Sequence, residues 1–60
     1  SSAASDVYKR QIYRVGELMM NDKDYRLARD CFSIVYDITQ ETQLKTLLDE
    51  LDKDLEDNNA

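Results

Sequence analysis

Apolar residues recur at steps of three and four along most of this 60-residue chain, and the chain contains no proline. This spacing places apolar side chains on one face of an α-helix, whereas a strand requires alternation of apolar and polar residues. Two polar stretches interrupt the pattern, NDKD at 21–24 and TQET at 39–42. Because asparagine and aspartate favour turns and helix N-caps, one helix should end at the first stretch and the next should begin near Asp24. The sequence therefore predicts an all-α fold of three helices, in which short connections make successive helices antiparallel.

Each predicted helix has its own apolar residues at helical spacing. The first helix has four of them, Tyr8, Ile12, Val15 and Met19. The second has Ala28, Cys31, Phe32 and Val35, together with Leu27, Ile34, Tyr36 and Ile38. This wider apolar surface predicts that the second helix contacts neighbours on two sides. The third has a narrow leucine stripe, Leu44, Leu47, Leu48, Leu51 and Leu55, opposite an acidic face.

Length and charge exclude several classes of protein. Sixty residues allow one small domain, and such a domain buries only about 60% of the surface that its unfolded chain exposes. The net charge is −5, and eight acidic residues against two basic ones follow Tyr36, so no nucleic-acid partner is expected. No run of about 18 apolar residues is present, so no membrane span is expected either. The lone Cys31 cannot form an internal disulfide, which favours a reducing compartment and a cytoplasmic location.

The first eleven residues, SSAASDVYKRQ, resemble translated sequencing-adaptor sequence rather than protein. The resemblance implies that residues 1–11 are a non-native leader and that native sequence begins near Ile12. The alternative is a natural leader that enters the first helix with Ser5 or Asp6 as its N-cap. At the other end, residues 58–60 predict a polar, frayed tail.

The order Ile12, Val15, Gly16, Met19, and then Ala28 and Phe32, resembles the tetratricopeptide-repeat signature. Gly16 and Ala28 are twelve residues apart, which is the interval of that family. Two further positions fit the pattern, an aromatic residue at Tyr25 and a small apolar residue at Val35. The match covers about residues 9–42. It departs from the family at Ile12, Val15 and Met19, which replace an aromatic residue, a leucine and a tyrosine, and at Gln40, which replaces the closing proline.

The resemblance implies an antiparallel helix-turn-helix over residues 12–42. In such a hairpin Gly16 lets the facing helix approach closely, Ala28 permits the crossing, and Phe32 fills the wedge between the helices. A glycine in the middle of a helix costs about 1 kcal/mol relative to alanine, so packing should compensate for Gly16. Residues 43–57 do not begin a second good repeat. Their single leucine stripe and acidic opposite face predict an amphipathic capping helix.

Nothing in the sequence supports catalysis, and no cofactor or metal ion is expected. The chain has no histidine that could activate Cys31, which is predicted to be a small buried hydrophobic residue. The acidic residues near the C-terminus lack the order of an EF-hand loop, so a solvated helix face is the better interpretation. We therefore expect that this chain is not an enzyme.

The family resemblance implies a protein-protein interaction scaffold, here the C-terminal fragment of a tetratricopeptide-repeat protein. Its partner would be a protein or peptide bound in a groove, for which Tyr13, Glu17 and Met20 are the candidate residues. Ile12, Leu18 and Tyr36 are expected to leave apolar surface uncovered, which leaves self-association of the isolated fragment open. Two alternatives also stay open: a three-helix oligomerisation element that pairs through the leucine stripe, and a regulatory tail of an enzyme or signalling protein.

Overall fold

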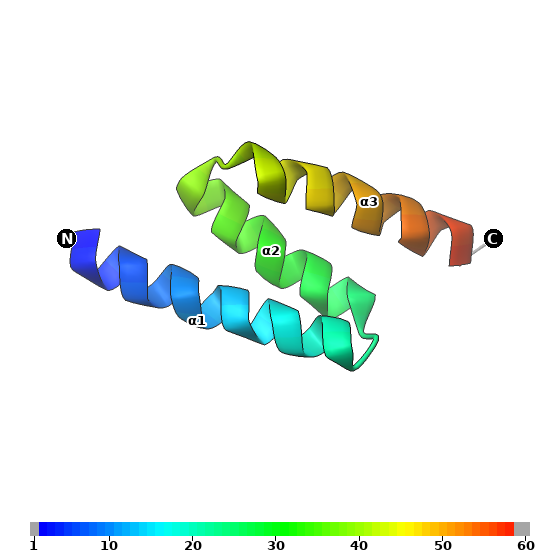
Figure 1. The fold of residues 1–60 in the computed structure, drawn as a ribbon, viewed down its shortest axis with the longest axis horizontal. Helices are drawn as coiled ribbons and strands as arrows, with labels where there is room; N and C mark the ends of the chain where they lie inside the picture. Colours follow the sequence, from blue (N-terminus) through cyan, green and yellow to red (C-terminus); the bar gives the residue numbers. More distant parts are fainter. Residues whose placement is uncertain (1, 59–60) are drawn as a thin grey trace.

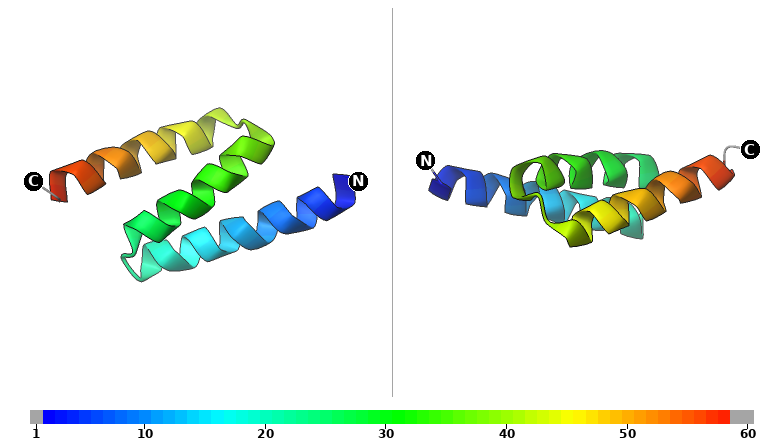
Figure 2. Two further views of the ribbon diagram at one scale, coloured as in Figure 1. Left: turned by 180° about the vertical axis from the view of Figure 1, so that it is seen from behind. Right: turned by 90° about the horizontal axis from the view of Figure 1, so that it is seen from above.

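The computed structural model describes residues 2–58, which form three helices: α1 (Ser2–Asn21), α2 (Tyr25–Thr39) and α3 (Thr42–Asn58). Successive helices run in opposite directions, and α2 lies between the other two (Figure 1). Within the described residues, α2 packs against both neighbours, while the backbones of α1 and α3 do not approach each other. The view from above shows α3 oblique to α1 (Figure 2). The predicted all-α fold, an antiparallel hairpin followed by a third helix, is confirmed.

The polar stretch after α1 forms the first turn, as predicted. Lys23 adopts the left-handed conformation with φ 63°, and the backbone N–H of Asp24 donates to the carbonyl of Met19 at 2.9 Å. This pattern is the Schellman ending of a helix. The Asp24 carboxylate then caps α2 by accepting the N–H of Leu27 at 3.3 Å. One aspartate therefore takes part in both the end of α1 and the start of α2.

The second turn contains only Gln40 and Glu41 between two helices. Gln40 is left-handed, with φ 57°, and its backbone N–H donates to the carbonyl of Tyr36 at 2.7 Å. Its side-chain amide donates to the same carbonyl at 3.2 Å. Gln40 thus ends α2 by capping it, where the family pattern uses a proline. The short turn places the first residues of α3 close to the last residues of α2.

Helix α1 passes from residue 11 to residue 12 without a break. It includes Ser5 and Asp6, so neither residue is an N-cap. The origin of residues 1–11 is a property of the coding sequence and stays a prediction. At the other end Asn58 is the last residue of α3, and residues 59–60 of the predicted frayed tail lie outside the described residues.

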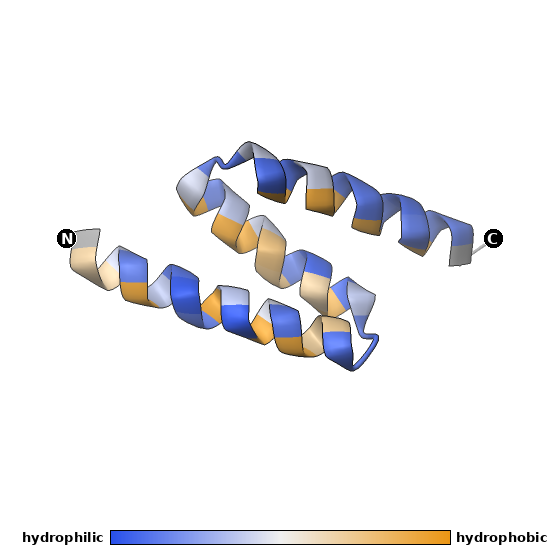
Figure 3. Ribbon diagram, viewed as in Figure 1, coloured by the Kyte–Doolittle hydropathy of each residue, from blue (hydrophilic) through white to orange (hydrophobic). Residues whose placement is uncertain are grey.

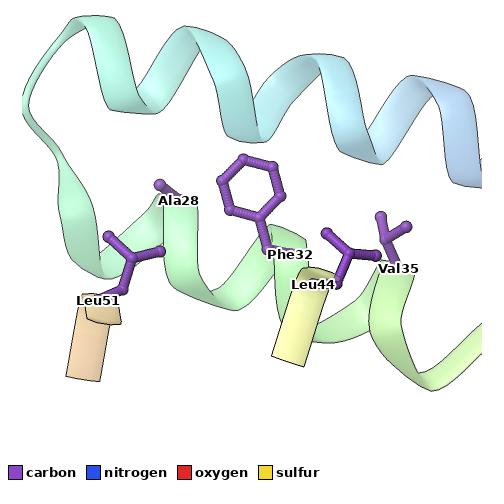
Figure 4. Packing of buried hydrophobic residues seen from close by; sticks show 5 residues of the cluster. All are labelled: Ala28, Phe32, Val35, Leu44 and Leu51. Carbon is purple, nitrogen blue, oxygen red and sulfur yellow. The ribbon is translucent and has the colours of Figure 1, made fainter. Parts of the chain in front are cut away.

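The core consists of five buried side chains from α2 and α3: Ala28, Phe32, Val35, Leu44 and Leu51. Figure 4 shows the Phe32 ring directed toward α1, while Leu44 and Leu51 reach α2 from α3. A Cβ atom placed on Gly16 would lie 2.8 Å from the Phe32 ring, so the glycine provides the space that the ring occupies. The predicted packing role of Gly16, Ala28 and Phe32 is confirmed. Val35 is 4% exposed, and Tyr25 is half-buried against this core.

The contact face of α1 is turned relative to the face that the sequence predicts. Ile12 and Met19 are half-buried against the core, as expected, but Val15 is 42% exposed. The reason is that Gly16 meets Phe32, and successive helical residues are rotated by about 100°. Val15 is therefore directed away from the contact, and its predicted place on the core face is wrong.

Three further expectations concern apolar side chains at the surface. Leu18 is 45% exposed, as predicted. Ile12 and Tyr36 are half-buried and pack against the core, so they leave less apolar surface uncovered than expected. Cys31 is also half-buried rather than fully buried.

Candidate binding pocket

A pocket of about 220 Å³ lies where all three helices come together near the second turn. Its lining residues come from α1, from the end of α2, from the second turn and from the start of α3: Lys9, Arg10, Tyr13, Val35, Thr39, Glu41 and Leu44. We refer to it as the α1–α3 pocket, because its lining extends from α1 across the end of α2 to the start of α3. Its walls are mainly apolar, and its charged groups come from Lys9, Arg10 and Glu41. Such a site can hold an apolar side chain with a polar group near its entrance.

Tyr13 is positioned in this pocket by the core beneath it. Its ring lies edge-on to the Phe32 ring, with centroids 5.3 Å apart and an interplanar angle of 63°. Edge-to-face pairs of this kind are favourable because the positive edge of one ring meets the negative face of the other. Tyr13 is nevertheless 40% exposed, so one part of the ring packs inward and another part faces the pocket. The Gly16–Phe32 contact thus also determines the position of Tyr13 in the pocket.

The opposite wall depends on the second turn. Val35 and Thr39 are one helical turn apart on α2, and Leu44 lies in the first turn of α3. Because only two residues separate these helices, the Gln40 cap brings Leu44 beside Val35. A longer or extended connection would move this wall away.

Of the three predicted groove residues, only Tyr13 lines the α1–α3 pocket. Glu17 is exposed and lies 3.9 Å from the guanidinium of Arg14. Met20 is half-buried and packs against the core, and it does not line this pocket. The same rotation of α1 that exposes Val15 directs Met20 inward. The three residues do not form one binding surface.

Six of the seven pocket residues were not identified as groove residues from the sequence, among them Val35, Thr39 and Leu44. Val35 and Leu44 were assigned to the apolar faces of their helices, which is consistent with their burial. Their second role depends on how α3 packs against α2. No short-range pattern in the chain encodes that packing, so the sequence held no signal for it.

A second opening lies at the far end of the α2–α3 contact, lined by Arg26, Arg29, Asp30, Asp52, Leu55 and Glu56. The Arg29 guanidinium donates to the Asp52 carboxylate through Nε and, at 3.4 Å, through a second nitrogen. The hydrogen bond with Asp52, and then the charge of Asp52, raise the pKa of Arg29. Both side chains are partly exposed, so solvent screens the pair. It links α2 to α3 at the surface.

The leucine stripe of α3 packs against the core of the same chain. Leu44 and Leu51 are 5% and 2% exposed, and Leu47 and Leu48 pack against the same core. An oligomer that pairs through this stripe would have to remove α3 from α2. The contact with α2 therefore favours the capping role over pairing between chains.

Two general features follow from the part of the chain that the structure describes. No group of three or more acidic or cysteine side chains lies together in a way that could hold a metal ion. None of the helices within residues 2–58 combines the length and apolar character needed to cross a membrane.

Comparison with known proteins gives no assignment. No protein-family model matches the chain, and neither a curated protein nor a solved structure shows a significant match to it.

Proposed function

We propose that this chain is a protein-interaction scaffold, a helical hairpin of tetratricopeptide-repeat type with a capping helix, and that it binds a peptide segment in the α1–α3 pocket. The observation that carries the proposal is the mainly apolar pocket whose walls come from all three helices, with Tyr13, Val35 and Leu44 as its apolar residues. Apolar pockets with a few polar groups at their edge are common ligand-binding sites in proteins.

The hairpin packing supports the repeat-type interpretation. Gly16 and Phe32 are in close contact, and Ala28 is fully buried at the same crossing. In the family that the sequence resembles, these positions bring the two helices of one repeat together. The polar outer face of α3 supports its role as a cap, because a terminal helix of a repeat protein has no further neighbour to cover it.

The pocket chemistry suggests how a peptide would be recognised. An apolar side chain of the peptide would contact Tyr13, Val35 and Leu44. A neighbouring carboxylate would be attracted by Lys9 and Arg10, although Lys9 already lies 3.0 Å from the Asp6 carboxylate. If residues 1–11 are a non-native leader, this basic rim is not part of the natural protein. The apolar walls are then the part of the site on which binding depends.

A selection from a random peptide library displayed on phage, with the full chain as bait, tests this function. We expect the selected peptides to share an apolar anchor. Replacing Tyr13 by serine should weaken their binding about tenfold or more, since a central aromatic contact is commonly worth at least 2 kcal/mol. Fluorescence polarisation with a labelled peptide measures this change.

A second variant separates binding from folding, because Tyr13 also packs on Phe32. Thr39→Arg would fill the pocket from the last residue of α2, where a cation is favourable for the helix. It should abolish peptide binding while circular dichroism stays unchanged. The matched control is Glu50→Gln on the outer face of α3, which should bind as the parent does. Peptides that bind Thr39→Arg and the parent equally well, or a library without any binder, would refute the proposed function.

A further inference from the structure

Helices α1 and α2 expose apolar side chains that α3 does not cover. Val15 and Leu18 on α1 are 42% and 45% exposed. On α1 the side that faces α3 is marked by Tyr13, which shares a pocket with Leu44. At about 100° per residue, Val15 lies about 200° and Leu18 about 140° around the helix from Tyr13. Both side chains are therefore on the side of α1 remote from α3.

The exposed apolar residues of α2 can be placed by the same angular argument. Leu27, Ile34 and Ile38 are 50%, 40% and 38% exposed. The side of α2 that faces α3 is marked by Arg29, which contacts Asp52. Leu27 and Ile38 lie roughly 180–200° from Arg29 and Ile34 lies about 140° from it. The hairpin thus has one apolar surface on the side away from α3, and we call these five residues the back face: Val15, Leu18, Leu27, Ile34 and Ile38.

The core of the described residues is small, and the back face is apolar surface outside it. Among the residues that the structure describes, five side chains are buried. Chains this small are commonly stabilised by disulfides, by a metal ion or by association with another chain. One cysteine cannot form an internal disulfide, and no metal-binding group of side chains is present within residues 2–58. The back face is the apolar surface through which association with another chain would add to this burial.

The charges at the edge of the back face are complementary between the two helices. Arg14 lies one helical turn from Leu18 on α1, and its side chain is 71% exposed. Asp30 lies one turn from both Leu27 and Ile34 on α2, and its side chain is 63% exposed. Exposed Asp37 follows Ile34 by one turn on the same edge. Arg14 lies 3.9 Å from the carboxylate of Glu17, and Asp30 lies 3.9 Å from the guanidinium of Arg29. A contact between two copies would therefore exchange these exposed pairs for pairs of Arg14 with Asp30 and Asp37.

We propose that two copies of this chain associate through their back faces with two-fold symmetry, so that α1 of each copy packs on α2 of the other. This arrangement brings Arg14 of one copy toward Asp30 and Asp37 of the second copy, and the symmetry repeats the contact. Packing α1 on α1 would instead place like charges together, which is unfavourable. The proposal does not depend on the α1–α3 pocket, which is on the other side of the hairpin. It also uses no residue before Arg14, except as part of the intact helix.

Sedimentation equilibrium of the full chain over a range of concentrations tests the association. The chain has a mass of 7.0 kDa. We expect the average mass to rise with concentration toward twice that value. Leu18→Glu or Ile34→Glu should raise the dissociation constant by more than about 100-fold, because each places an unpaired carboxylate in the contact. Glu50→Gln on the outer face of α3 is the matched control and should associate as the parent does.

Charge reversal tests which helices meet. Arg14→Asp should weaken association by a few-fold, and the double variant Asp30→Arg with Asp37→Arg should do the same, as expected for exposed ion pairs. Combining all three changes should restore the parental dissociation constant. All these side chains are exposed in the single chain, and circular dichroism should confirm that the helices are retained.

Four results would overturn the proposal. The parent could stay a monomer at all concentrations, or Leu18→Glu and Ile34→Glu could associate as strongly as the parent. Leu47→Glu, on the α3 stripe, could abolish the dimer while the back-face variants do not. The combined charge reversal could fail to restore binding, which excludes the packing of α1 on α2. Peptide binding in the α1–α3 pocket is measured separately, so its failure is distinguishable from each of these results.

Discussion

The contact between α1 and α2, here the first crossing, and the contact between α2 and α3, the second crossing, are built in opposite ways. Between α1 and α2, the missing side chain of Gly16 makes room for the Phe32 ring, which a Cβ atom would approach to 2.8 Å. Between α2 and α3, contact depends on Leu44 and Leu51, which extend from α3 and are almost fully buried. The first crossing should therefore be sensitive to added atoms, and the second to removed atoms.

The outer surfaces of the same helices differ as well. Figure 3 shows the apolar residues of α3 along the edge turned toward α2, with a hydrophilic edge opposite. Helix α1 also has apolar residues along the edge turned away from α2 (Figure 3). A helix that ends an assembly needs only one apolar side, whereas a helix inside an assembly needs two. The difference is what the proposed capping role of α3 predicts, and it favours a neighbour for the α1–α2 hairpin.

The largest expected effect concerns the second crossing. Leu51→Ala removes a buried side chain, which typically costs about 2–5 kcal/mol. Because the backbones of α1 and α3 do not approach each other, the loss should open α3 selectively. Hydrogen exchange should show reduced protection of the α3 amides and retained protection in the α1–α2 hairpin.

Leu47→Ala is the matched control for this prediction. Leu47 is only half-buried against the core, so its truncation should reduce α3 protection less than that of Leu51. Equal loss of protection in all three helices after Leu51→Ala would show that the chain unfolds as one unit. The two crossings would then not be independent.

The first crossing is tested by Gly16→Ala. The added methyl group overpacks the contact with Phe32, at a cost of about 1–3 kcal/mol. Alanine also favours the helix by up to about 1 kcal/mol, so the net change should be a modest loss of stability. Thermal unfolding followed by circular dichroism measures it.

Repeating Gly16→Ala in a Phe32→Leu variant tests whether the loss of stability depends on the Phe32 ring. Phe32→Leu is itself destabilising, but it removes the ring atoms that lie 2.8–3.1 Å from the added Cβ. In that background Gly16→Ala should be neutral or stabilising, because only the helix preference remains. A higher melting temperature for Gly16→Ala in the parent would contradict the tight crossing described for α1 and α2.

The number and order of the helices could be predicted from the sequence because they depend on local signals. The spacing of apolar residues set the helices, and Asp24 and its polar neighbours set the first turn. The burial of Ala28, Phe32 and Val35 could also be predicted, since the spacing of Gly16, Ala28 and Phe32 resembles a known hairpin.

The rotation of α1 could not be predicted, because it depends on which residue meets Phe32. A change of one residue in the contact moves the buried face by about 100°, which is enough to expose Val15 and to bury part of Met20. The Arg29–Asp52 pair joins residues 23 positions apart, so it depends on the packing of α3 on α2. The α1–α3 pocket depends on that packing too, and only Tyr13 of its walls was identified as a binding residue.

The smallest expected effect concerns the ion pair at the second crossing. Asp52→Asn keeps the shape of the side chain and removes its charge, at a cost of about 0.2–1 kcal/mol for a partly exposed pair. Thermal unfolding at low salt should show this loss, and it should disappear in about 1 M salt, where charges are screened within roughly 3 Å. Asp54→Asn on the exposed face of α3 is the control and should change stability less.

The pKa of Arg29 determines how the stability contributed by the Arg29–Asp52 pair depends on pH. Asp52 raises the pKa of Arg29 in the folded chain. A base with a raised pKa contributes its stability below its ordinary pKa and loses it only as the pH rises through the folded value. Arginine titrates far above neutrality, so the difference between the parent and Asp52→Asn should be constant from about pH 6 to about pH 9. A difference that persists undiminished at high salt would show that Asp52 holds α3 by packing and not by its charge. A difference that disappears between about pH 6 and about pH 9 would show that a group other than Arg29 controls it.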